Sequence, residues 1–312
     1  MVPSSRVISG EGGIRLSVTE WGDASNGRPT VLLVHGYPDT SAVWQPVASL
    51  LASHYHVVAY DVRGAGASSA PGSTGGYRLS HLIEDLAAVV DATSLDRPVH
   101  LVGHDWGSIQ GWEAVSTDRL QGRIASFTSL YAPGLDHAAA WAAIRWRHPT
   151  PHHLSQLLGQ QLRWWYVAAF HLPGAAALWR AGLGRGWPRI LQWVEHVGRS
   201  DSYPAPTVAE DGARGIALYR ANFGPRMTRA HPRPTTVPVQ VIVPLEDHFV
   251  SPALSEGLEQ WVDRLWRTEV VGGHWLPRTD PELVARYVAQ LVDHIEGGPE
   301  APRLRQARIQ RS

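Results

Sequence analysis

The residues from Val99 to Ile109, VHLVGHDWGSI, place an aspartate where a catalytic nucleophile is expected. A short apolar run leads into Gly103, and Asp105 then stands between Gly103 and Gly107. This Gly-x-nucleophile-x-Gly spacing is typical of a sharp strand-to-helix elbow, whose usual nucleophile is a serine. A carboxylate at that position could attack an alkyl carbon. The alternative is that Asp105 only caps the helix that follows, a role that aspartate favours.

A nucleophile of this kind needs a base, and the base needs an acid that orients it. Along the chain the acid comes before the histidine. Asp247 follows one apolar run, in VIVPLEDHF, and His274 follows the next, in VVGGHW. We therefore predict Asp247 as the orienting acid and His274 as the base, with Glu246 as the competing acid. The alternatives are that Asp247 is a turn residue and His274 a packed loop imidazole.

Two backbone amides are expected to bind the oxyanion that forms when an ester on the nucleophile is hydrolysed. One is the amide of Trp106, directly after Asp105. The other lies in the loop HGYPD, which follows an early apolar run, and the Tyr37 amide is the most natural choice. A cis peptide bond before Pro38 would aim this amide, although few X–Pro bonds are cis.

Alternating strands and helices must position these residues. Runs typical of strands cover 14–21, 30–35, 56–60, 99–103, 124–131, 238–244 and 267–273, and helical patterns cover 42–53 and 79–92. This order predicts an α/β fold with a mostly parallel sheet and helices on both faces. The candidate residues would then lie at the carboxyl ends of strands. A last helix is expected after Asp280, with Pro281 at its first position.

The segment 135–229 interrupts this alternation. It has no strand pattern and is rich in tryptophan, histidine and alanine. We therefore predict a helical cap, 135–229, inserted into a core made of 1–134 and 230–296. Residues 297–312 contain glycine, proline and arginine without periodicity, which predicts a disordered tail or linker. A basic contact with a membrane or partner is the alternative for this tail.

The composition of the 312 residues excludes several kinds of chemistry. The formal net charge is zero, so we expect no nucleic-acid partner. Neither cysteine nor lysine occurs, which excludes thiol nucleophiles, cysteinyl zinc sites and Schiff-base lysines. No signal peptide or membrane span is predicted, and we expect a cytoplasmic protein. GAGASS lacks the dinucleotide-loop spacing and His152–His153 lacks metal-ligand spacing, so we expect no cofactor and no metal.

The motifs HGYPD, YDVRGAGASS, GHDWGS, EDHFVSP and GGHWLP together resemble those of the α/β-hydrolase-fold epoxide hydrolases, over about residues 14–295. The sequence is especially similar to the mycobacterial epoxide hydrolase D type. In that type an N-terminal hydrolase is joined to a C-terminal domain like the short-chain dehydrogenases. The resemblance implies an α/β-hydrolase fold, and a chain that is a fragment lacking that domain or a stand-alone hydrolase half. Whether the chain forms a homodimer is left open.

The resemblance also implies two cap tyrosines that hold the epoxide oxygen. YVAAFHLPG is similar to the first tyrosine segment and places Tyr166, and ALYRANF resembles the second and places Tyr219. Tyr203 is a nearby competitor, and the alternative is that these tyrosines only pack in the cap. Residues 170–172 read Phe-His-Leu where the family commonly has Phe-Gln-Glu, which puts the local polar network and the substrate preference in doubt.

The predicted function is therefore epoxide hydrolysis. Asp105 would open the epoxide as an alkyl ester, and water activated by His274 would release a vicinal diol. The cap tryptophans favour an apolar substrate such as a fatty (lipid) or aromatic epoxide, although they could equally be core residues. A haloalkane dehalogenase with the same nucleophile is the nearest alternative, although Tyr37 stands where that family has a polar halide partner. A hydrolase-fold protein that binds a ligand without catalysis is the second alternative.

Overall fold

The sheet at the centre of the molecule is mostly parallel, as predicted. The structure, a computed structural model, describes residues 3–22, 27–131, 133–198, 200 and 203–309. Within these residues nine strands form one sheet in the order β1-β2-β4-β3-β5-β6-β7-β8-β9. The strands are β1 (Ser4–Ser9), β2 (Arg15–Trp21), β3 (Thr30–Val34), β4 (His56–Tyr60), β5 (Val99–His104), β6 (Ile124–Leu130), β7 (Val239–Pro244), β8 (Leu265–Val270) and β9 (Arg308–Ile309). The pairs between β4 and β8 in this order are parallel, and β1, β2 and β9 join antiparallel.

Helices cover both faces of the sheet because successive strand residues point to opposite sides. In β3, Leu32 and Val34 belong to the apolar core on one face, together with α2 and α3. Val31 and Leu33 belong to the core on the other face, together with α1 and α11. All four side chains are fully buried. These helices are α1 (Gln45–Leu51), α2 (Leu79–Thr93), α3 (Trp106–Val115) and α11 (Pro281–Ile295).

The sequence located most of these elements closely. The first six predicted strands begin and end within one residue of observed strands, whereas the last, predicted at 267–273, is β8 at Leu265–Val270. Asp280 caps α11 as expected, because its Oδ1 accepts a hydrogen bond of 3.0 Å from the Leu283 N–H. The sequence did not predict β1, because only Ile8 of its six residues is buried and apolar and polar residues do not alternate along the strand.

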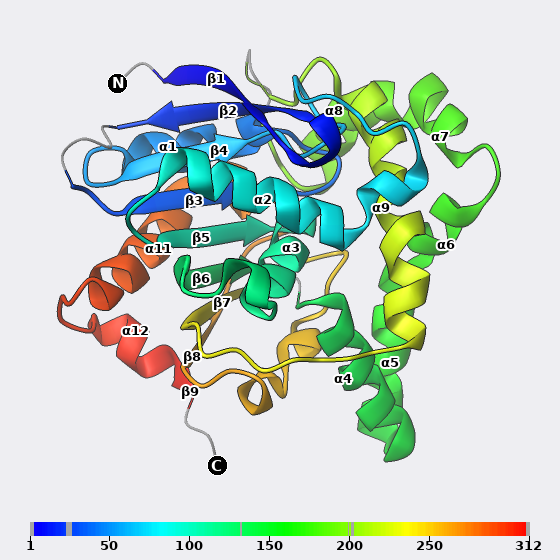
Figure 1. The fold of residues 1–312 in the computed structure, drawn as a ribbon. Helices are drawn as coiled ribbons and strands as arrows, with labels where there is room; N and C mark the ends of the chain where they lie inside the picture. The colour runs from blue at the N-terminus through cyan, green and yellow to red at the C-terminus, as the bar shows by residue number, and fades with distance from the viewer. Residues whose placement is uncertain (1–2, 23–26, 132, 199, 201–202, 310–312) are drawn as a thin grey trace.

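The described residues between 135 and 229 form helices and contribute no strand to the sheet. The helices are α4 (Leu135–Arg147), α5 (Pro151–Arg163), α6 (Trp165–His171), α7 (Ala175–Leu178), a π-helical turn at Trp179–Leu183, α8 (Gly184–Val194) and α9 (Val208–Thr228). Figure 1 shows α6, α7 and α9 beyond the end of the sheet toward which β5 runs. α9 contacts α4, α6, α7 and α8 and so connects the segment.

The predicted disordered tail is wrong for residues 297–309. α12 (Pro302–Ala307) leads into β9, where Arg308 pairs with Trp266 of β8. Leu304 is buried against Trp266 and Leu291. A six-residue helix with few apolar side chains shows no detectable periodicity in the sequence. The segment is ordered because β9, which follows the helix, pairs with the edge of β8. Residues 310–312 of the predicted tail lie outside the described residues.

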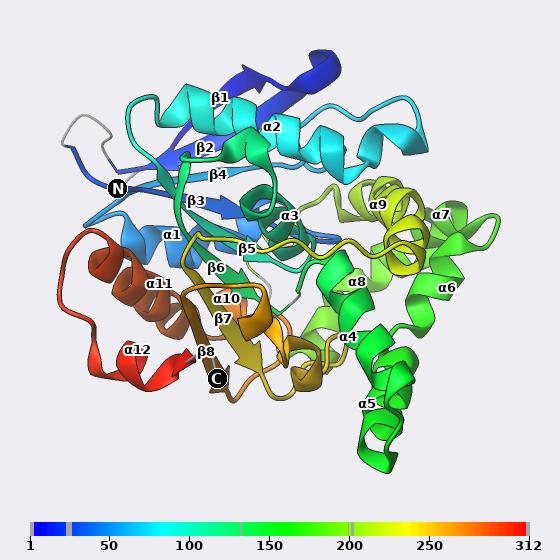
Figure 2. The ribbon, with the colours of Figure 1, turned by 60° about the horizontal axis from the view of Figure 1, so that its bottom comes forward.

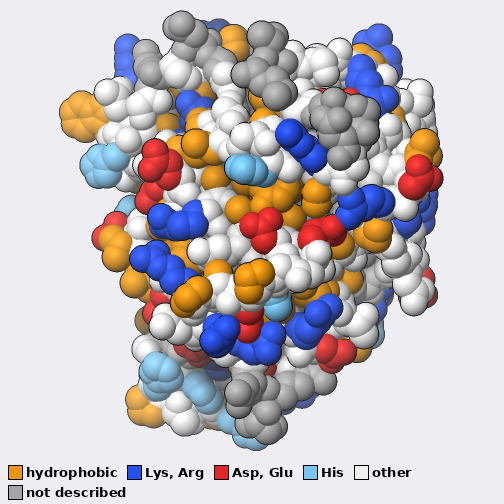
Figure 3. Space-filling model, turned by 90° about the vertical axis from the view of Figure 1, so that its left-hand side faces the viewer, with side chains coloured by type: hydrophobic (Ala, Val, Ile, Leu, Met, Phe, Trp, Pro, Cys, Tyr) orange, Lys and Arg blue, Asp and Glu red, His pale blue; other side chains and the backbone are white. Residues whose placement is uncertain are grey.

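The surface away from the helical segment carries charges of both signs. Figure 3 shows the face on the left-hand side of Figure 1, where arginines and acidic side chains are interspersed around a hydrophobic area. None of the helices in the described part of the chain is both long and apolar enough to cross a membrane.

Candidate active site

Asp105 forms the sharp turn between β5 and α3. Its φ of 52° and ψ of −120° lie in a region that residues with a side chain rarely adopt, so the turn is strained. Glycines allow the close packing around it: a Cβ on Gly107 would collide with the Val34 carbonyl, and one on Gly103 would collide with the backbone of Gly107. The Asp105 side chain makes no capping hydrogen bond to α3, so the interpretation as a helix cap is wrong.

The loop after β3 holds the Asp105 carboxylate from one side. The backbone N–H of Tyr37 donates a hydrogen bond of 2.7 Å to Asp105 Oδ1, and the Tyr37–Pro38 peptide bond is cis. Trp106 is the first residue of α3, so its N–H is one of those without a partner inside the helix. The two amides predicted for an oxyanion hole are therefore that of Tyr37, which binds the Asp105 carboxylate, and that of Trp106, the residue after Asp105.

His274 lies between two carboxylates. Its Nδ1 is 2.7 Å from Asp247 Oδ2 and its Nε2 is 3.7 Å from Asp105 Oδ2. Asp247 Oδ1 accepts the backbone N–H groups of Phe249 and Val250 at 2.6 and 2.9 Å. Because an ionised carboxylate only accepts hydrogen bonds, Nδ1 carries a proton and Nε2 faces the nucleophile. The competing acid, Glu246, is exposed, whereas Asp247 is buried.

The charges of this group stabilise one another. Burial disfavours the imidazolium, but the Asp247 carboxylate and hydrogen bonding with Asp105 outweigh it and raise the pKa of His274 well above its usual value. Burial also disfavours the Asp105 carboxylate, but His274 outweighs this effect and lowers the pKa of Asp105. At neutral pH the resting site therefore holds an ionised nucleophile beside a protonated imidazole.

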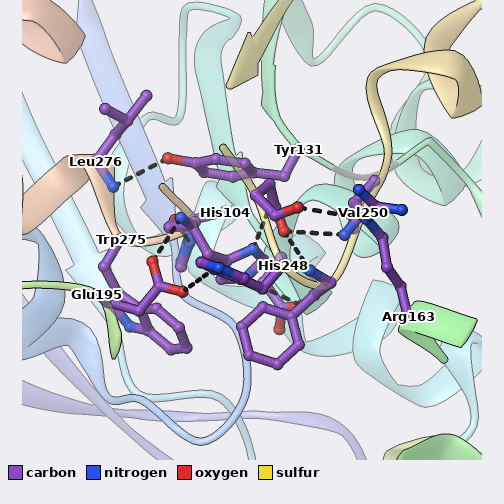
Figure 4. Close-up of polar contacts among 12 residues, drawn as sticks. His104, Tyr131, Arg163, Glu195, His248, Val250, Trp275 and Leu276 are labelled. Atoms are coloured by element: carbon purple, nitrogen blue, oxygen red, sulfur yellow. Dashed lines mark hydrogen bonds and ion pairs between the residues drawn. The ribbon is translucent and has the colours of Figure 1, made fainter. Parts of the chain in front are cut away.

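Residues that the sequence did not indicate fix the His274 backbone. The His274 carbonyl accepts a hydrogen bond of 3.0 Å from His104 Nε2, whose imidazole is kept neutral because burial lowers its pKa to about 3. The Glu195 carboxylate accepts the His274 N–H at 2.8 Å. Figure 4 shows Arg163, the last residue of α5, and Glu195, the residue after α8, approaching this network. The sequence contains one indication that Glu195 is unusual: it is the first acidic residue after Asp136.

A cavity of about 330 Å³ lies above the nucleophile. Asp105, His274 and Glu195 are the charged residues that line it among the described residues. The rest of the wall is mostly apolar and aromatic: Tyr37, Pro38, Trp165, Tyr166, Phe170, Trp179, Leu183, Trp187, Ile190, Leu191, Val194, Tyr219, Phe249 and Trp275. Such a wall suits an apolar ligand that presents one polar group.

Tyr166 and Tyr219 both line this cavity with Asp105. Their rings are 5.8 Å apart in an edge-to-face arrangement, and the Tyr219 side chain is hydrogen-bonded to Tyr166. Burial and the negative charge of Asp105 raise the pKa of Tyr166, and burial with the neighbouring Tyr166 raises the pKa of Tyr219. Both phenols therefore keep their protons and can donate hydrogen bonds into the cavity.

The competing tyrosine, Tyr203, is used elsewhere. Its hydroxyl donates a hydrogen bond of 2.7 Å to Asp39 Oδ1, and Asp39 Oδ2 accepts the Trp275 indole N–H at 2.9 Å. Tyr203 does not line the cavity above Asp105. Within the described ranges, no three histidine or acidic side chains are placed to hold a metal ion.

Comparison with known proteins identifies related chains. Residues 29–281 match the alpha/beta hydrolase fold family. The chain is 34% identical over 314 residues to the probable oxidoreductase EphD of Mycobacterium tuberculosis, a match that covers 98% of this chain and 52% of that protein. It therefore spans about half the length of this relative. It is 28% identical over 298 residues to epoxide hydrolase 3 of Xenopus tropicalis, covering 89% of this chain and 74% of that protein.

A solved structure shares the fold. It belongs to the epoxide hydrolases found in metagenomes from hot environments, and it superimposes with a TM-score of 0.74 at 23% identity. The match covers 96% of this chain and 100% of that one. At this identity the likeness shows the fold.

Proposed function

The chain belongs to the alpha/beta hydrolase fold family, and from this premise we propose that it is an epoxide hydrolase that forms vicinal diols. The observation that carries the proposal is the pair of protonated phenols, Tyr166 and Tyr219, in the same apolar cavity as the Asp105 carboxylate. A carboxylate can displace the oxygen of a strained ring, and two O–H donors can receive that oxygen. The epoxide hydrolases among the relatives support this chemistry.

In the first step Asp105 Oδ2 attacks one epoxide carbon, and the bond from that carbon to the ring oxygen breaks. Tyr166 and Tyr219 donate hydrogen bonds to the departing oxygen and one of them supplies its proton. Each well-placed donor to a developing oxyanion contributes about 2–4 kcal/mol to the transition state. Asp105 Oδ1, which the Tyr37 N–H already binds, becomes the carbonyl oxygen of the new ester.

In the second step His274 Nε2 takes a proton from a water molecule, and the water oxygen attacks the Asp105 Cγ. The amides of Tyr37 and Trp106 receive the negative charge on Oδ1. The bond from Cγ to Oδ2 then breaks, and Oδ2 takes the remaining proton of the attacking water as it leaves in the diol. The water oxygen stays in the Asp105 carboxylate, and His274 is protonated again, as in the resting site. Asp247 keeps the imidazole oriented throughout, through the hydrogen bond of 2.7 Å to Nδ1.

Formation of the ester prepares His274 for this second role. The resting imidazole is protonated in part because Asp105 is negative. Alkylation neutralises Asp105, removes that favourable charge and lowers the pKa of His274. The proton that His274 loses can re-form the phenol that gave its proton to the alkoxide. The same charge change therefore ends the first step and enables the second.

We assign the helical segment 135–229 the role of a cap that selects the substrate. It supplies both tyrosines and most of the aromatic wall, including Trp165, Trp179 and Trp187. This lining favours an apolar epoxide, either fatty or aromatic. A haloalkane dehalogenase would need a free donor for the halide, but the Trp106 indole is hydrogen-bonded to Tyr219. A cytoplasmic location and a homodimer stay predictions.

The test is a screen of purified protein against terminal, styrene-type and fatty-acid epoxides and against haloalkanes, with diol and halide measured separately. Asp105→Ala is the inactive control, and Glu246→Gln is a matched carboxylate change outside the cavity. We expect diol formation that Asp105→Ala abolishes and Glu246→Gln retains. Halide release without diol would make the protein a dehalogenase. Ligand binding without either product would favour the non-catalytic alternative.

A further inference from the structure

Helix α5 exposes the side that a surface helix normally buries. Its one fully buried residue is polar: Gln160 donates 3.0 Å to the Phe249 carbonyl and accepts 2.8 Å from the Ser251 N–H. Gln156 donates to the Glu256 carboxylate at 3.1 Å. A surface helix of a monomeric protein usually places its apolar stripe here and its polar residues outside. In α5 a glutamine is the buried residue, Leu157 is partly buried, and three other leucines are exposed.

The opposite side of α5 is a row of leucines. Leu154, Leu158 and Leu162 follow at intervals of four residues and so lie on one side of α5. Leu154 and Leu158 are each about 200° around the helix from the glutamine two positions later, Gln156 or Gln160. Their exposed fractions are 45%, 60% and 65%. Trp146, at the end of α4, is 72% exposed. Figure 2 shows α5 projecting from the body of the molecule, so this side stands clear of the sheet and its helices.

The leucine row borders a hollow of about 690 Å³, larger than the cavity above Asp105. The hollow lies between α4 and α5 and is almost entirely apolar: its lining is Ala139, Ala142, Ala143, Trp146, Leu154, Leu157, Leu158, Gln161 and Met227. The hollow and the leucine row form one apolar face, which we call the α4–α5 face. An apolar surface of this kind on a soluble chain indicates a partner or a membrane.

The charge around this face indicates the kind of partner. After Asp136, which is buried, α4 and α5 contain no acidic residue, and their arginines are Arg145, Arg147 and Arg163. Arg145 is paired with Glu256, a partly exposed glutamate beside α5. Arg147 is exposed and directly follows Trp146. By contrast, the face in Figure 3 mixes both signs of charge.

We propose that the α4–α5 face docks on an anionic lipid surface. Leucine and tryptophan side chains beside arginine are the combination that holds an amphipathic helix in the boundary between lipid headgroups and chains. Anionic headgroups complement two helices whose own exposed charge is basic, with Arg147 directly beside Trp146. The same charge disfavours a symmetric contact between two copies of this face, since each would present its arginines to the other.

Docking would place the cavity beside the lipid. Trp165, two residues after α5 ends, is 70% exposed and also lines the cavity above Asp105. Arg163, at the end of α5, donates to the Asp247 carbonyl at 3.5 Å, so the same helix touches the loop that carries the predicted acid. If the proposed epoxide hydrolysis holds, on which this step rests, the substrates are apolar epoxides dissolved in the membrane.

The test is co-sedimentation of the full chain with phosphatidylcholine vesicles, prepared with and without phosphatidylglycerol. The variant combines Leu158→Glu and Leu162→Glu, neither of which lines the catalytic cavity. The matched control is Leu95→Glu, because Leu95 is 75% exposed but lies in the loop before β5, at the opposite end of that strand from Asp105. Hydrolysis of a water-soluble epoxide is measured in parallel, so that binding and catalysis are scored separately.

We expect the wild type and Leu95→Glu to bind vesicles that contain phosphatidylglycerol, and salt to weaken this binding. The double variant should partition at least about tenfold more weakly, because two leucines lose their apolar burial. All three proteins should hydrolyse the soluble epoxide equally. Three results would overturn the proposal: no binding by the wild type, equal binding with and without phosphatidylglycerol, or binding that the double variant retains. A dimer of the wild type that the double variant dissolves, without vesicle binding, would instead make this face a contact between copies.

Discussion

The carboxylate of Glu195, the residue after α8, accepts a hydrogen bond of 2.8 Å from the backbone N–H of His274. The Glu195 side chain is only 2% exposed, and a Cβ at position 273 would collide with it, so Gly273 permits the approach. The helical segment and the predicted catalytic base are therefore tied together at the backbone of one residue. Glu195 is a positioning residue in the proposed mechanism, and its effect passes through His274.

Replacing Glu195 distinguishes its role in positioning His274 from a contribution to the stability of the fold. Glu195→Ala leaves the buried His274 N–H without an acceptor, at a cost of about 1–3 kcal/mol. If that cost falls on the placement of His274, hydrolysis of the ester slows by roughly tenfold to a hundredfold. Glu195→Gln keeps one carbonyl oxygen and should restore most of the rate. Stopped-flow single turnover resolves the two steps. A lower melting temperature with an unchanged ester hydrolysis rate would leave Glu195 purely structural.

Replacement of the base should trap the covalent intermediate. In His274→Gln no group can activate the water, so the ester on Asp105 forms and persists. Intact-mass spectra after mixing with an epoxide should show an adduct equal to the substrate mass, and digestion should locate it on the peptide that contains Asp105. Absence of any adduct under single turnover would contradict the proposed ester.

The wild type allows a complementary isotope test. In a single turnover in ¹⁸O-water, the label should enter the Asp105 carboxylate, because the water attacks Cγ and Asp105 Oδ2 departs with the diol. Label found in the diol instead, with none in the protein, would indicate direct attack of water on the epoxide.

The two cavity tyrosines should control the first step. Tyr166→Phe and Tyr219→Phe each remove one donor to the departing oxygen, and we expect ester formation to slow by roughly thirtyfold to a thousandfold for each. The double variant should lose more than either single variant. Tyr203→Phe is the matched control, because the Tyr203 hydroxyl is bonded to Asp39 and does not reach the cavity. Rapid-quench measurement of the ester gives the rate of the first step. An equal loss of this rate in all three single variants would contradict the role proposed for Tyr166 and Tyr219.

Asp39 should make the stability depend on pH. Burial raises the pKa of Asp39 to about 6, although hydrogen bonds from Tyr203 and Trp275 oppose the rise. Because the folded-state pKa lies above the unfolded value, its contribution is fully present below about pH 4 and is lost as the pH rises through about 6. The loss amounts to about 3 kcal/mol.

The variant Asp39→Asn removes this titration. Urea unfolding of the wild type and Asp39→Asn between about pH 4 and about pH 7 should give free energies of unfolding whose difference changes by about 3 kcal/mol in favour of the variant as the pH rises. The absolute stability of Asp39→Asn can be lower, since the amide cannot accept both hydrogen bonds, but the slope is the measurement. Parallel curves would show that Asp39 is already ionised at low pH.

Local patterns in the sequence were sufficient for the framework of this protein. The strands could be located because their apolar runs are short and bounded, and the elbow because glycines flank Asp105 at fixed spacing. Chain order then indicated Asp247 and His274 without any structure. These features depend on residues that are neighbours along the chain, and backbone sterics and side-chain alternation act at that range.

Tertiary structure decided the choices that depend on contacts between distant residues. Only the fold buries Asp247 against His274 and leaves Glu246 exposed, and only the fold sends Tyr219 into the cavity and Tyr203 to Asp39. The edge of β8 that orders the C-terminal residues, the approach of Glu195 to His274 and the outward leucines of α5 follow from the same cause. A side chain's partner across the fold is set by how helices and strands meet in space, and the spacing of residues along the chain does not contain that information.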